Sequence, residues 1–290
     1  MATKIYTKEY AGQLEEIFES SSKFLRAFGG EIQTILGAEY NNKFLELKVS
    51  DTETVIQEYS TDANVAFGTG TGNSNRFGPR REVKSVDLQV EFDNPLAIHE
   101  GVDNFTVNDV PQEVVAEKLA HGASAWTNHY NQLLGDMLAD NASETLDGEL
   151  TEAGVIEVFN KANAAFINNG VSQMITWVAY VNPEVYNIIV DSKLTTTLKN
   201  ADVNVRTNTV IEFKGFQIEV VPSAQLKASV YFAPENVGVV GVAIQVARAI
   251  DSEDFNGVAI QSAGKLGRYI PEANKSAIIV ADLVEATPEG

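Results

Sequence analysis

The chain has 290 residues, of which 44% are apolar, and its 21 basic and 40 acidic side chains give a formal net charge of −19 at pH 7. This size and apolar content allow one large or two ordinary domains with a buried core. The acidic balance argues against a protein that holds nucleic acid through clustered Lys and Arg. The absence of cysteine excludes disulfides, thiolate metal sites and a cysteine nucleophile.

The sequence contains no apolar stretch of the length that a membrane span needs. Residues 1–18 carry charges and lack the apolar segment of a signal peptide. We therefore expect synthesis in the cytoplasm and no membrane partner.

The first predicted elements are a helix and a long hairpin. Residues 10–28 have apolar side chains near helical spacing, and Gly29 and Gly30 would end that helix. Strand-like alternation begins at Phe44. Residues 52–92 then predict two long strands of about thirteen residues each, joined by a glycine-rich loop. Because an isolated two-stranded ribbon is marginal in water, this arm is expected to lie against another subunit.

The stretch AFGTGTGNSNRFGPRR, residues 66–81, has four glycines, three arginines and no acid. It suggests either a phosphate cradle or the tip of the hairpin. A dinucleotide fingerprint starting at Gly68 and Gly70 fails because the third position is Asn73 and a strand follows instead of a helix. A P-loop ending at Gly264 and Lys265 fails because position 259 is Ala and position 266 is Leu. The sequence therefore favours the hairpin tip.

A long helix is predicted over residues 111–139, with Pro111 in its first turn. Its apolar stripe, which we expect to face the core, consists of Val115, Leu119, Gly122, Trp126, Tyr130, Leu133 and Met137. Residues 136–157, called the acidic region below, contain seven acids and no base. An EF-hand starting at Asp140 fails because Ala142 and Thr145 occupy required positions. A loose divalent-cation site and a solvated acidic face both remain open there.

The second half alternates helices and strands. Residues 152–168 predict a helix with Val155, Val158, Phe159, Ala162 and Phe166 on one side. Residues 174–181 predict a buried strand, and a helix follows at Pro183 with Asn182 as its N-cap. Further strands are predicted within residues 213–223 and 228–243, and two more around a turn at Pro271.

Catalytic chemistry is not indicated. Among the three histidines, His121 and His129 lie eight residues apart on the long predicted helix, too far apart to share a metal, and His99 is separate. No G-x-S-x-G motif is present. We predict no catalytic, cofactor-binding or metal-binding residue, and hence no enzyme.

The succession of a terminal arm, a hairpin, a long helix and a mixed half resembles the major capsid proteins of tailed bacteriophages, which have the HK97-like fold. The segments YVNPEVYNIIVDS, FKGFQIEVVPS and VYFAPENVGVVGVA resemble successive parts of that family's A domain. The segment FNGVAIQSAGKLGRYI resembles the strand that returns to its P domain.

The resemblance implies an α+β fold with four regions: an N-terminal arm at 1–50, an E-loop hairpin at 51–95, a P domain at 96–175 and 245–290 with its spine helix at 111–139, and an A domain at 176–244. It implies an icosahedral shell of hexamers and pentamers around packaged double-stranded DNA, bound without sequence specificity. Such a protein would reside in the virion after synthesis in the host bacterial cytoplasm. The acidic charge would leave the DNA free to slide.

The resemblance also implies partners. A portal protein is expected, and a separate scaffolding protein, because only about 50 residues precede the hairpin. Lys84 is the only lysine of the return arm and lies beyond the tip, so cross-linking between subunits stays open. Two alternatives remain: an encapsulin-type nanocompartment shell, and an α/β enzyme that acts on a nucleotide or sugar.

The hairpin tip is the candidate site of contact between subunits. Residues 63–84 contain Arg76, Arg80, Arg81 and Lys84 against the single acid Glu82, a local charge of +3. Arginine forks bind carboxylates well, so the acidic region of a neighbouring subunit is the expected partner. A mobile, solvated tip is the alternative interpretation.

Overall fold

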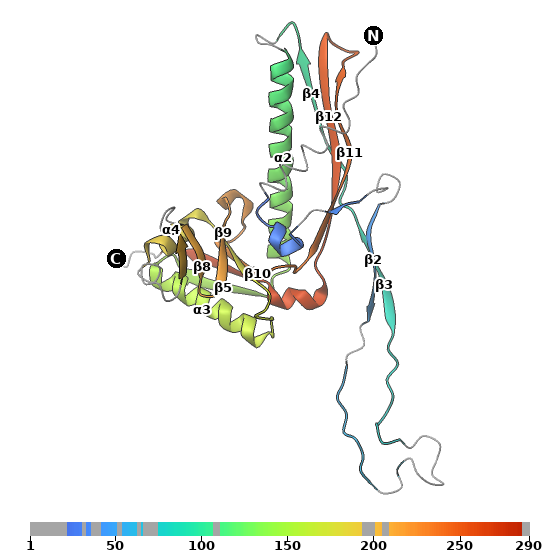
Figure 1. Ribbon diagram of the computed structural model, residues 1–290, viewed down its shortest axis with the longest axis vertical. Helices are drawn as coiled ribbons and strands as arrows, with labels where there is room; N and C mark the ends of the chain where they lie inside the picture. The colour runs from blue at the N-terminus through green and yellow to red at the C-terminus, as the bar shows by residue number, and fades with distance from the viewer. Residues whose placement is uncertain are drawn as a thin grey trace. The chain divides into compact units, whose positions relative to one another are not determined.

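The computed structural model describes residues 22–30, 33–35, 42–50, 54–62, 65, 75–106, 111–192, 201–204 and 209–285 (Figure 1). The chain divides into two compact units. The hairpin unit is Lys43–Glu91, and the main unit comprises Met1–Asn42 and Phe92–Gly290. The mixture of sheets with a few helices agrees with the predicted α+β class. None of the described helices is long and apolar enough to span a membrane.

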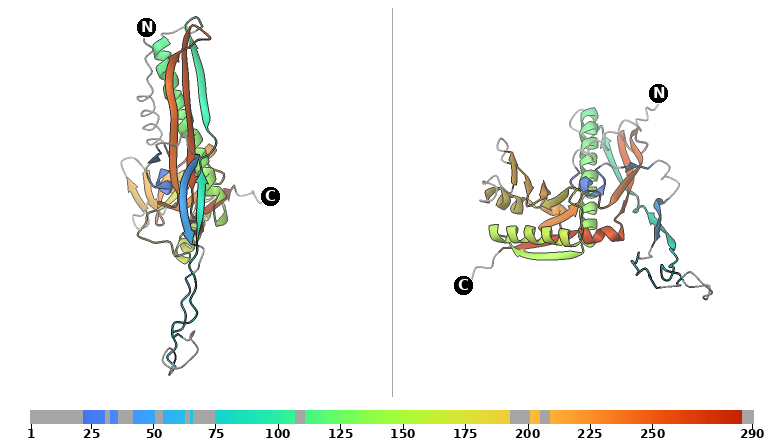
Figure 2. Two further views of the ribbon diagram at one scale, coloured as in Figure 1. Left: turned by 90° about the vertical axis from the view of Figure 1, so that its right-hand side faces the viewer. Right: turned by 60° about the horizontal axis from the view of Figure 1, so that its bottom comes forward.

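A four-stranded sheet and a long helix form one part of the main unit. The sheet has the order β1-β11-β12-β4, in which β11 pairs antiparallel with β12, β12 antiparallel with β4, and β1 parallel with β11. The strands are β1 (Gln33–Thr34), β4 (Leu96–Asp103), β11 (Val239–Asp251) and β12 (Gly257–Tyr269). Helix α2 (Pro111–Asp140) runs along this sheet in both Figure 1 and Figure 2.

Helix α2 confirms the predicted long helix and shifts its buried face. Trp126 and Tyr130 of the predicted stripe are buried, and the Trp126 indole Nε1 donates to Ser262 Oγ of β12 at 3.0 Å. The other members of that stripe are only partly buried. The fully buried positions in the second half of the helix are Leu134 and Leu138, one step away from the predicted Leu133 and Met137. The shift arises because the helix packs on two sheets rather than on one surface.

The second sheet has seven strands in the order β5-β13-β10-β6-β9-β8-β7. The strands are β5 (Glu144–Glu149), β6 (Trp177–Val181), β7 (Ala201–Asn204), β8 (Thr209–Phe213), β9 (Phe216–Val220), β10 (Val230–Pro234) and β13 (Ile279–Val284). Strand β10 pairs antiparallel with both β6 and β13, while β6–β9 and β13–β5 are parallel pairs.

The two faces of this sheet belong to two apolar clusters. On β6, Val178 and Tyr180 pack in the cluster that contains the buried residues of α2, whereas Trp177, Ala179 and Val181 pack in the other. The second cluster is covered by α3 (Glu152–Asn168) and α4 (Pro183–Asp191). Strands buried on both faces need continuous apolar sequence, which β6 has.

The predicted helices of this half are confirmed. All five predicted apolar positions of α3 are buried, and Thr151 caps the helix by accepting from Gly154 N at 3.1 Å. The side chain of Asn182 caps α4 by accepting from Val185 N at 2.8 Å, with Pro183 in the first turn. The Pro271 turn continues into a 3-10 helix, η3 (Glu272–Ala277), and a further 3-10 turn, η2 (Ser223–Gln225), precedes β10.

Most of the predicted first helix, residues 10–28, lies outside the described residues. Its end is η1 (Leu25–Phe28), a 3-10 turn closed by Gly29 with φ 98°, so the predicted stop is confirmed. Phe24 is fully buried, and its ring centroid lies 4.9 Å from that of Tyr180. This contact joins the N-terminal segment to the seven-stranded sheet.

Strands β4 and β5 were not predicted. Strand β5 lies inside the acidic region and shows no strand pattern in the sequence. Four of its six side chains are polar or charged, and Leu146 is its one buried apolar residue. It pairs with β13, and both strands fall in the predicted P domain, yet they share one sheet with strands of the predicted A domain. The expected boundary between those regions therefore runs within a sheet.

The hairpin unit corrects the predicted strands. Strand β2 (Lys43–Ser50) pairs antiparallel with β3 (Ser85–Glu91), so the first strand precedes residue 51. The described arms beyond this base, residues 54–62 and 75–84, contain no strand. The predicted ladder of about thirteen residues per arm is wrong. The glycines at 68, 70 and 72 lie outside the described residues.

Candidate functional site

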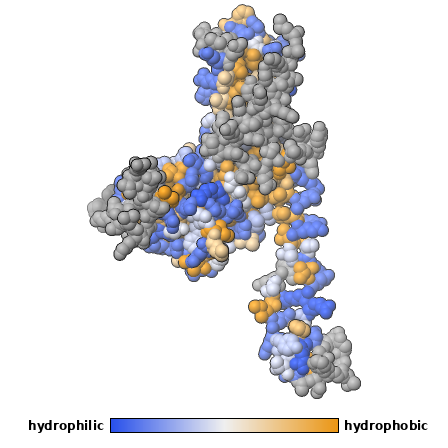
Figure 3. Space-filling model, in the orientation of Figure 1, coloured by the Kyte–Doolittle hydropathy of each residue, from blue (hydrophilic) through white to orange (hydrophobic). Residues whose placement is uncertain are grey.

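The base of the hairpin unit has one apolar and one polar face. Cross-strand pairs Leu45–Val90, Leu47–Leu88 and Val49–Val86 alternate with Glu46–Gln89 and Lys48–Asp87. Figure 3 shows the result as hydrophobic and hydrophilic side chains interleaved along the described part of the hairpin.

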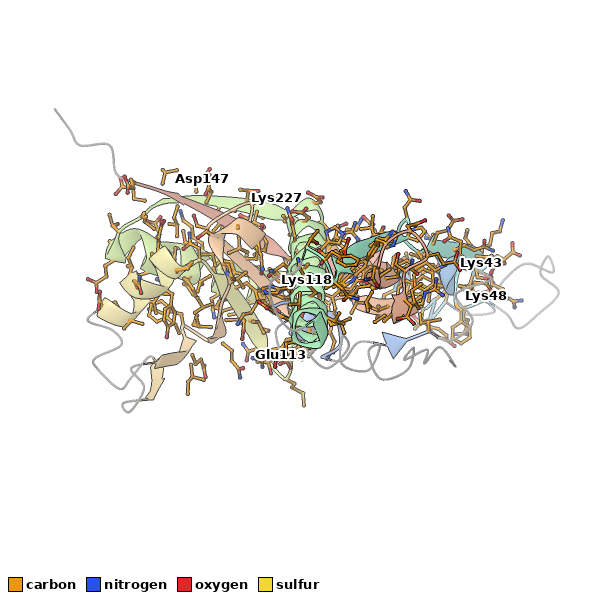
Figure 4. The ribbon with its side chains drawn as sticks, turned by 90° about the horizontal axis from the view of Figure 1, so that it is seen from above. Lys43, Lys48, Glu113, Lys118, Asp147 and Lys227 are labelled. Atoms are coloured by element: carbon orange, nitrogen blue, oxygen red, sulfur yellow. The ribbon has the colours of Figure 1, made fainter. Side chains whose placement is uncertain are left out.

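The apolar face becomes more exposed toward the arms. Val49 and Val86 are 44% and 57% exposed, although both have strong β propensity and face the same side. On the polar side Lys43 binds Glu46, with Nζ and Oε1 2.7 Å apart, which lowers the pKa of that carboxyl (Figure 4 labels Lys43 and Lys48). Two strands cannot cover an apolar face by themselves, so this surface suits a partner.

The guanidinium of Arg76 organises the hairpin's outer part. It donates to three backbone carbonyls of the opposite arm: Nε to Val65 at 3.1 Å, Nη1 to Ser60 at 3.3 Å and Nη2 to Asp62 at 3.3 Å. The Arg76 carbonyl accepts from Ser60 N at 2.9 Å. Arg76 therefore has an internal role that the sequence did not indicate, because a charge pattern cannot show which carbonyls will surround it.

Aromatic and amide contacts hold the arms together next to Arg76. Tyr59 and Phe77 meet edge to face with centroids 5.2 Å apart, and Gln57 Nε2 donates to Pro79 O at 3.1 Å. Gly78 has φ 78°, a conformation that other residues rarely adopt. Phe77 is nevertheless 76% exposed and Ile56 96% exposed. These exposed apolar side chains extend the candidate contact surface of the hairpin unit. The sequence did not indicate them as site residues, because the alternating pattern predicted two paired strands there.

The other predicted contact residues are exposed on the return arm. Arg80 and Arg81 lie in the exposed segment, and Lys84 Nζ is 3.9 Å from Glu82 Oε2 with both side chains largely in solvent. The structure thus separates the four predicted residues into one that organises the hairpin and three that face outward. Contact with another subunit stays a prediction for all four.

The structure also distinguishes six of the seven acids of the acidic region by their partners and exposure. Lys227 Nζ lies 3.3 Å from Asp136 and 2.9 Å from Asp140, and these hydrogen bonds raise the pKa of the lysine. Lys161 binds Glu157 at 2.7 Å and lowers the pKa of that carboxyl. Three other acids, Glu144, Asp147 and Glu149, lie exposed on β5.

These three acids lie on an edge strand, since β5 ends the seven-stranded sheet. They form no ion pair with any described residue. Figure 4 shows Asp147 at the margin of the sheet, with Lys227 closer to α2. The edge is therefore an acidic surface that carries no neutralising cation of its own.

Nothing resembling a catalytic or metal centre is formed by the described residues. His99 Nε2 lies 3.3 Å from Gln261 Nε2, and His121 Nε2 lies 3.5 Å from Glu117 Oε1. No described group of three or more His, Asp or Glu side chains could hold a metal ion. A pocket of about 350 Å³ lies next to β6 and the β8–β9 turn. It is lined by amides, Trp177 and a single titratable side chain, Glu212, which does not make an acid–base pair.

Several described basic side chains of the main unit interact with other residues of that unit. Lys265 is buried on β12, with Nζ 4.8 Å from the centroid of the Phe92 ring. Arg268 Nε binds Asp93 Oδ2 at 3.1 Å. On α2, Lys118 binds Glu100 of β4 at 3.3 Å (Figure 4 labels Lys118, and Glu113 nearer the start of the helix). The failed P-loop at Gly264 and Lys265 is thus a buried strand.

No protein-family model and no curated protein sequence matches this chain. Solved structures do match. The structure is similar to one from Mycobacterium phage Che8, with TM-score 0.64 and 16% identity over 97% of this chain and 92% of that chain. It is similar to the capsid structure of Cyanophage P-SCSP1u, with TM-score 0.63 and 10% identity over 92% and 89% of the two chains.

A third similar structure is a virus-like particle from Pyrococcus furiosus, with TM-score 0.53 and 13% identity over 95% of this chain and 98% of that chain. Similarity at these identities concerns the fold, and it extends over both units. The chain therefore shares the fold of these phage capsid and virus-like-particle structures, in agreement with the predicted resemblance.

Proposed function

We propose that this chain is the major capsid protein of a tailed bacteriophage and assembles with itself into an icosahedral shell around double-stranded DNA. The observation that carries the proposal is the hairpin unit. Its base exposes the apolar residues Val49 and Val86, and its described arms have no strand partner. A neighbouring copy would supply both missing partners.

The difference in burial between the main unit and the hairpin unit supports this proposal. The main unit buries two apolar clusters of its own, which leaves the hairpin unit available for contacts between copies. In the proposed shell, 1–50 is the N-terminal arm, 51–95 the E-loop, 96–175 with 245–290 the P domain, and 176–244 the A domain. The paired base of the hairpin starts at Lys43, inside the proposed arm, so the arm and E-loop are continuous.

The proposed partners follow from assembly. A separate scaffolding protein would guide shell closure, a portal protein would occupy one vertex, and DNA would be enclosed without sequence-specific contacts. The net charge of −19 suits an inner wall that does not hold DNA tightly. The protein would reside in the virion and have no enzymatic activity.

A nanocompartment shell is the second candidate, favoured by the similarity to the virus-like particle from Pyrococcus furiosus. The two candidates differ in contents. A phage shell would package DNA through a portal, whereas a nanocompartment would enclose a cargo protein. An enzyme that acts on nucleotides or sugars has no support, because the described pocket contains no pair of titratable groups.

The test is assembly of the purified chain, alone and with a co-expressed scaffolding protein. Closed particles seen by electron microscopy and analytical ultracentrifugation are the expected result. DNA inside particles isolated from infected cells, and none of a cargo enzyme, would favour the phage shell. A stable monomer or dimer under every condition would contradict both shell candidates.

A further inference from the structure

The return arm and the edge of the seven-stranded sheet have complementary properties. Residues 80–84, called the basic segment below, contain Arg80, Arg81 and Lys84 against Glu82. No described backbone hydrogen bond involves residues 80–83, and their side chains are exposed. An extended segment with unpaired N–H and C=O groups is suited to pair with the edge of a sheet.

Strand β5 offers such an edge. It is the terminal strand of its sheet, and its second edge pairs with no strand among the described residues. Six residues at strand rise span about 20 Å, enough to accommodate a five-residue segment. Its charged residues are Glu144, Asp147 and Glu149, all acidic and all exposed.

The register of β5 on β13 adds an electrostatic reason for a cationic partner. Asp147 is the direct neighbour of Asp282 in the parallel ladder, and both are exposed. Like charges in such neighbouring positions destabilise a sheet. The Asp282 carboxylate accepts from Ser229 Oγ at 3.3 Å, a neutral donor that leaves the negative charge in place. A basic segment laid along β5 would relieve this repulsion.

Within the main unit, the other described sheet edge with visible side chains, β4, is less suitable. Its Glu100 is bound to Lys118, and its Asp103 Oδ1 accepts from Phe105 N at 2.8 Å. In the acidic region itself, Asp136, Asp140 and Glu157 are bound to lysines. Charge complementarity therefore favours β5 over β4 and over these three lysine-bound acids.

We infer that the basic segment of one copy docks along strand β5 of a second copy as an added strand, with Arg81 on the face that carries Asp147 and Glu149 and Arg80 on the opposite face. The inference rests on the proposed shell function and identifies which two surfaces meet. Backbone pairing would supply the alignment, and the opposite charges would speed and orient the encounter.

Charge exchange tests the electrostatic half. Two reversals, Arg80→Glu with Arg81→Glu and Asp147→Lys with Glu149→Lys, should each slow assembly at about 150 mM salt by about tenfold or more. Combining all four changes should restore most of the rate. The control, Glu113→Lys with Glu184→Lys, alters exposed acids on α2 and α4 by the same net charge and should assemble normally. A four-fold variant no better than either reversal, with an unchanged circular dichroism spectrum, would overturn the inference.

Cross-linking tests the geometry, because the chain has no cysteine of its own. A Val83→Cys, Thr145→Cys variant treated with a short bismaleimide after assembly should give a ladder of covalent multimers in denaturing gels. Either single-cysteine variant should give no ladder. Only intramolecularly linked monomer, or no product, would overturn docking between copies. If such unlinked particles still formed, the proposed shell function would stand and only this inference would fail.

Discussion

The main unit and the hairpin unit differ in how far they bury their apolar side chains. In the main unit, the central strands β6 and β10 of the seven-stranded sheet are buried on both faces, and Phe159, Phe216 and Phe232 pack at centroid distances from 4.9 to 5.9 Å. In the hairpin unit, apolar residues alternate just as regularly, yet Val86 and Phe77 remain mostly exposed. The main unit therefore buries its large apolar side chains within itself, whereas the hairpin unit leaves several of them exposed.

The hairpin unit is nevertheless ordered locally. Arg76 binds three carbonyls across the two arms, and Tyr59 packs on Phe77. Such contacts pre-organise a binding segment and reduce the entropy lost on docking. We therefore expect mutations in the main unit to change the stability of the fold, and mutations in the hairpin unit to change assembly.

The largest expected effect is on the main unit. Phe232→Ala removes a fully buried ring and should lower the free energy of unfolding of the free subunit by about 3–5 kcal/mol. The matched change Phe77→Ala in the hairpin unit should alter it by less than about 0.5 kcal/mol. Urea denaturation followed by circular dichroism measures both. Equal effects of the two changes would contradict the separation of the units.

The apolar face of the hairpin base should matter for assembly alone. Val49→Thr with Val86→Thr keeps strand propensity and shape but places hydroxyls on the surface that a neighbour would cover. We expect each unpaired hydroxyl to cost about 1–3 kcal/mol in the assembled state and almost nothing in the free subunit. Particle yield and melting temperature, compared with free-subunit stability, provide the readout. Particles of normal yield and heat resistance would mean that this face stays in solvent.

Arg76 and Arg80 should differ despite their equal charge. Arg76→Gln removes hydrogen bonds to backbone carbonyls, each of which contributes about 0.5–1.5 kcal/mol. The arms should therefore exchange their amide hydrogens faster and be cleaved faster by proteases that do not cut at Arg or Lys. Arg80→Gln should leave the free hairpin unchanged and affect assembly only. Hydrogen exchange of residues 54–62 distinguishes them. Identical exchange in the two variants would show that the contacts of Arg76 do not order the arms.

The smallest effect at neutral pH concerns the buried tyrosines of the main unit. Burial raises the pKa of Tyr130 and of Tyr180 above the usual value of 10. Because the folded-state pKa values are raised, this contribution to stability is complete below about pH 10 and is lost as the pH rises further, by up to about 1.4 kcal/mol per pH unit for each group.

The check on this expectation is Tyr130→Phe, which should lose less stability than the native chain between pH 9 and pH 11 in urea denaturation. Assembly contacts of the hairpin unit do not contribute to this slope when free subunits are measured. The same slope in both proteins would show that Tyr130 ionises as readily in the folded state as in the unfolded chain.

The sequence by itself determined the elements that depend on neighbours along the chain. The buried side of α3, the Asn182 cap with Pro183, and the stop at Gly29 follow from helical periodicity and from the few residues that suit helix ends. The order of these elements also carried the resemblance to the capsid fold. The basic residues Arg80 and Arg81 could also be identified from the sequence, because they are neighbours in a segment with a single acid.

Only the tertiary structure decided which distant segments meet. The acidic sequence of β5 concealed a strand because the parallel partner, β13, lies more than a hundred residues away, and periodicity does not identify a partner. The same holds for Lys227, which neutralises Asp136 and Asp140 and so leaves β5 as the uncompensated acidic edge. Backbone pairing and ion pairs depend on distances in space, and a charge pattern along the chain contains no such distances. The same reason explains why the charge pattern around Arg76 did not indicate its internal role, which the three carbonyls around its guanidinium show.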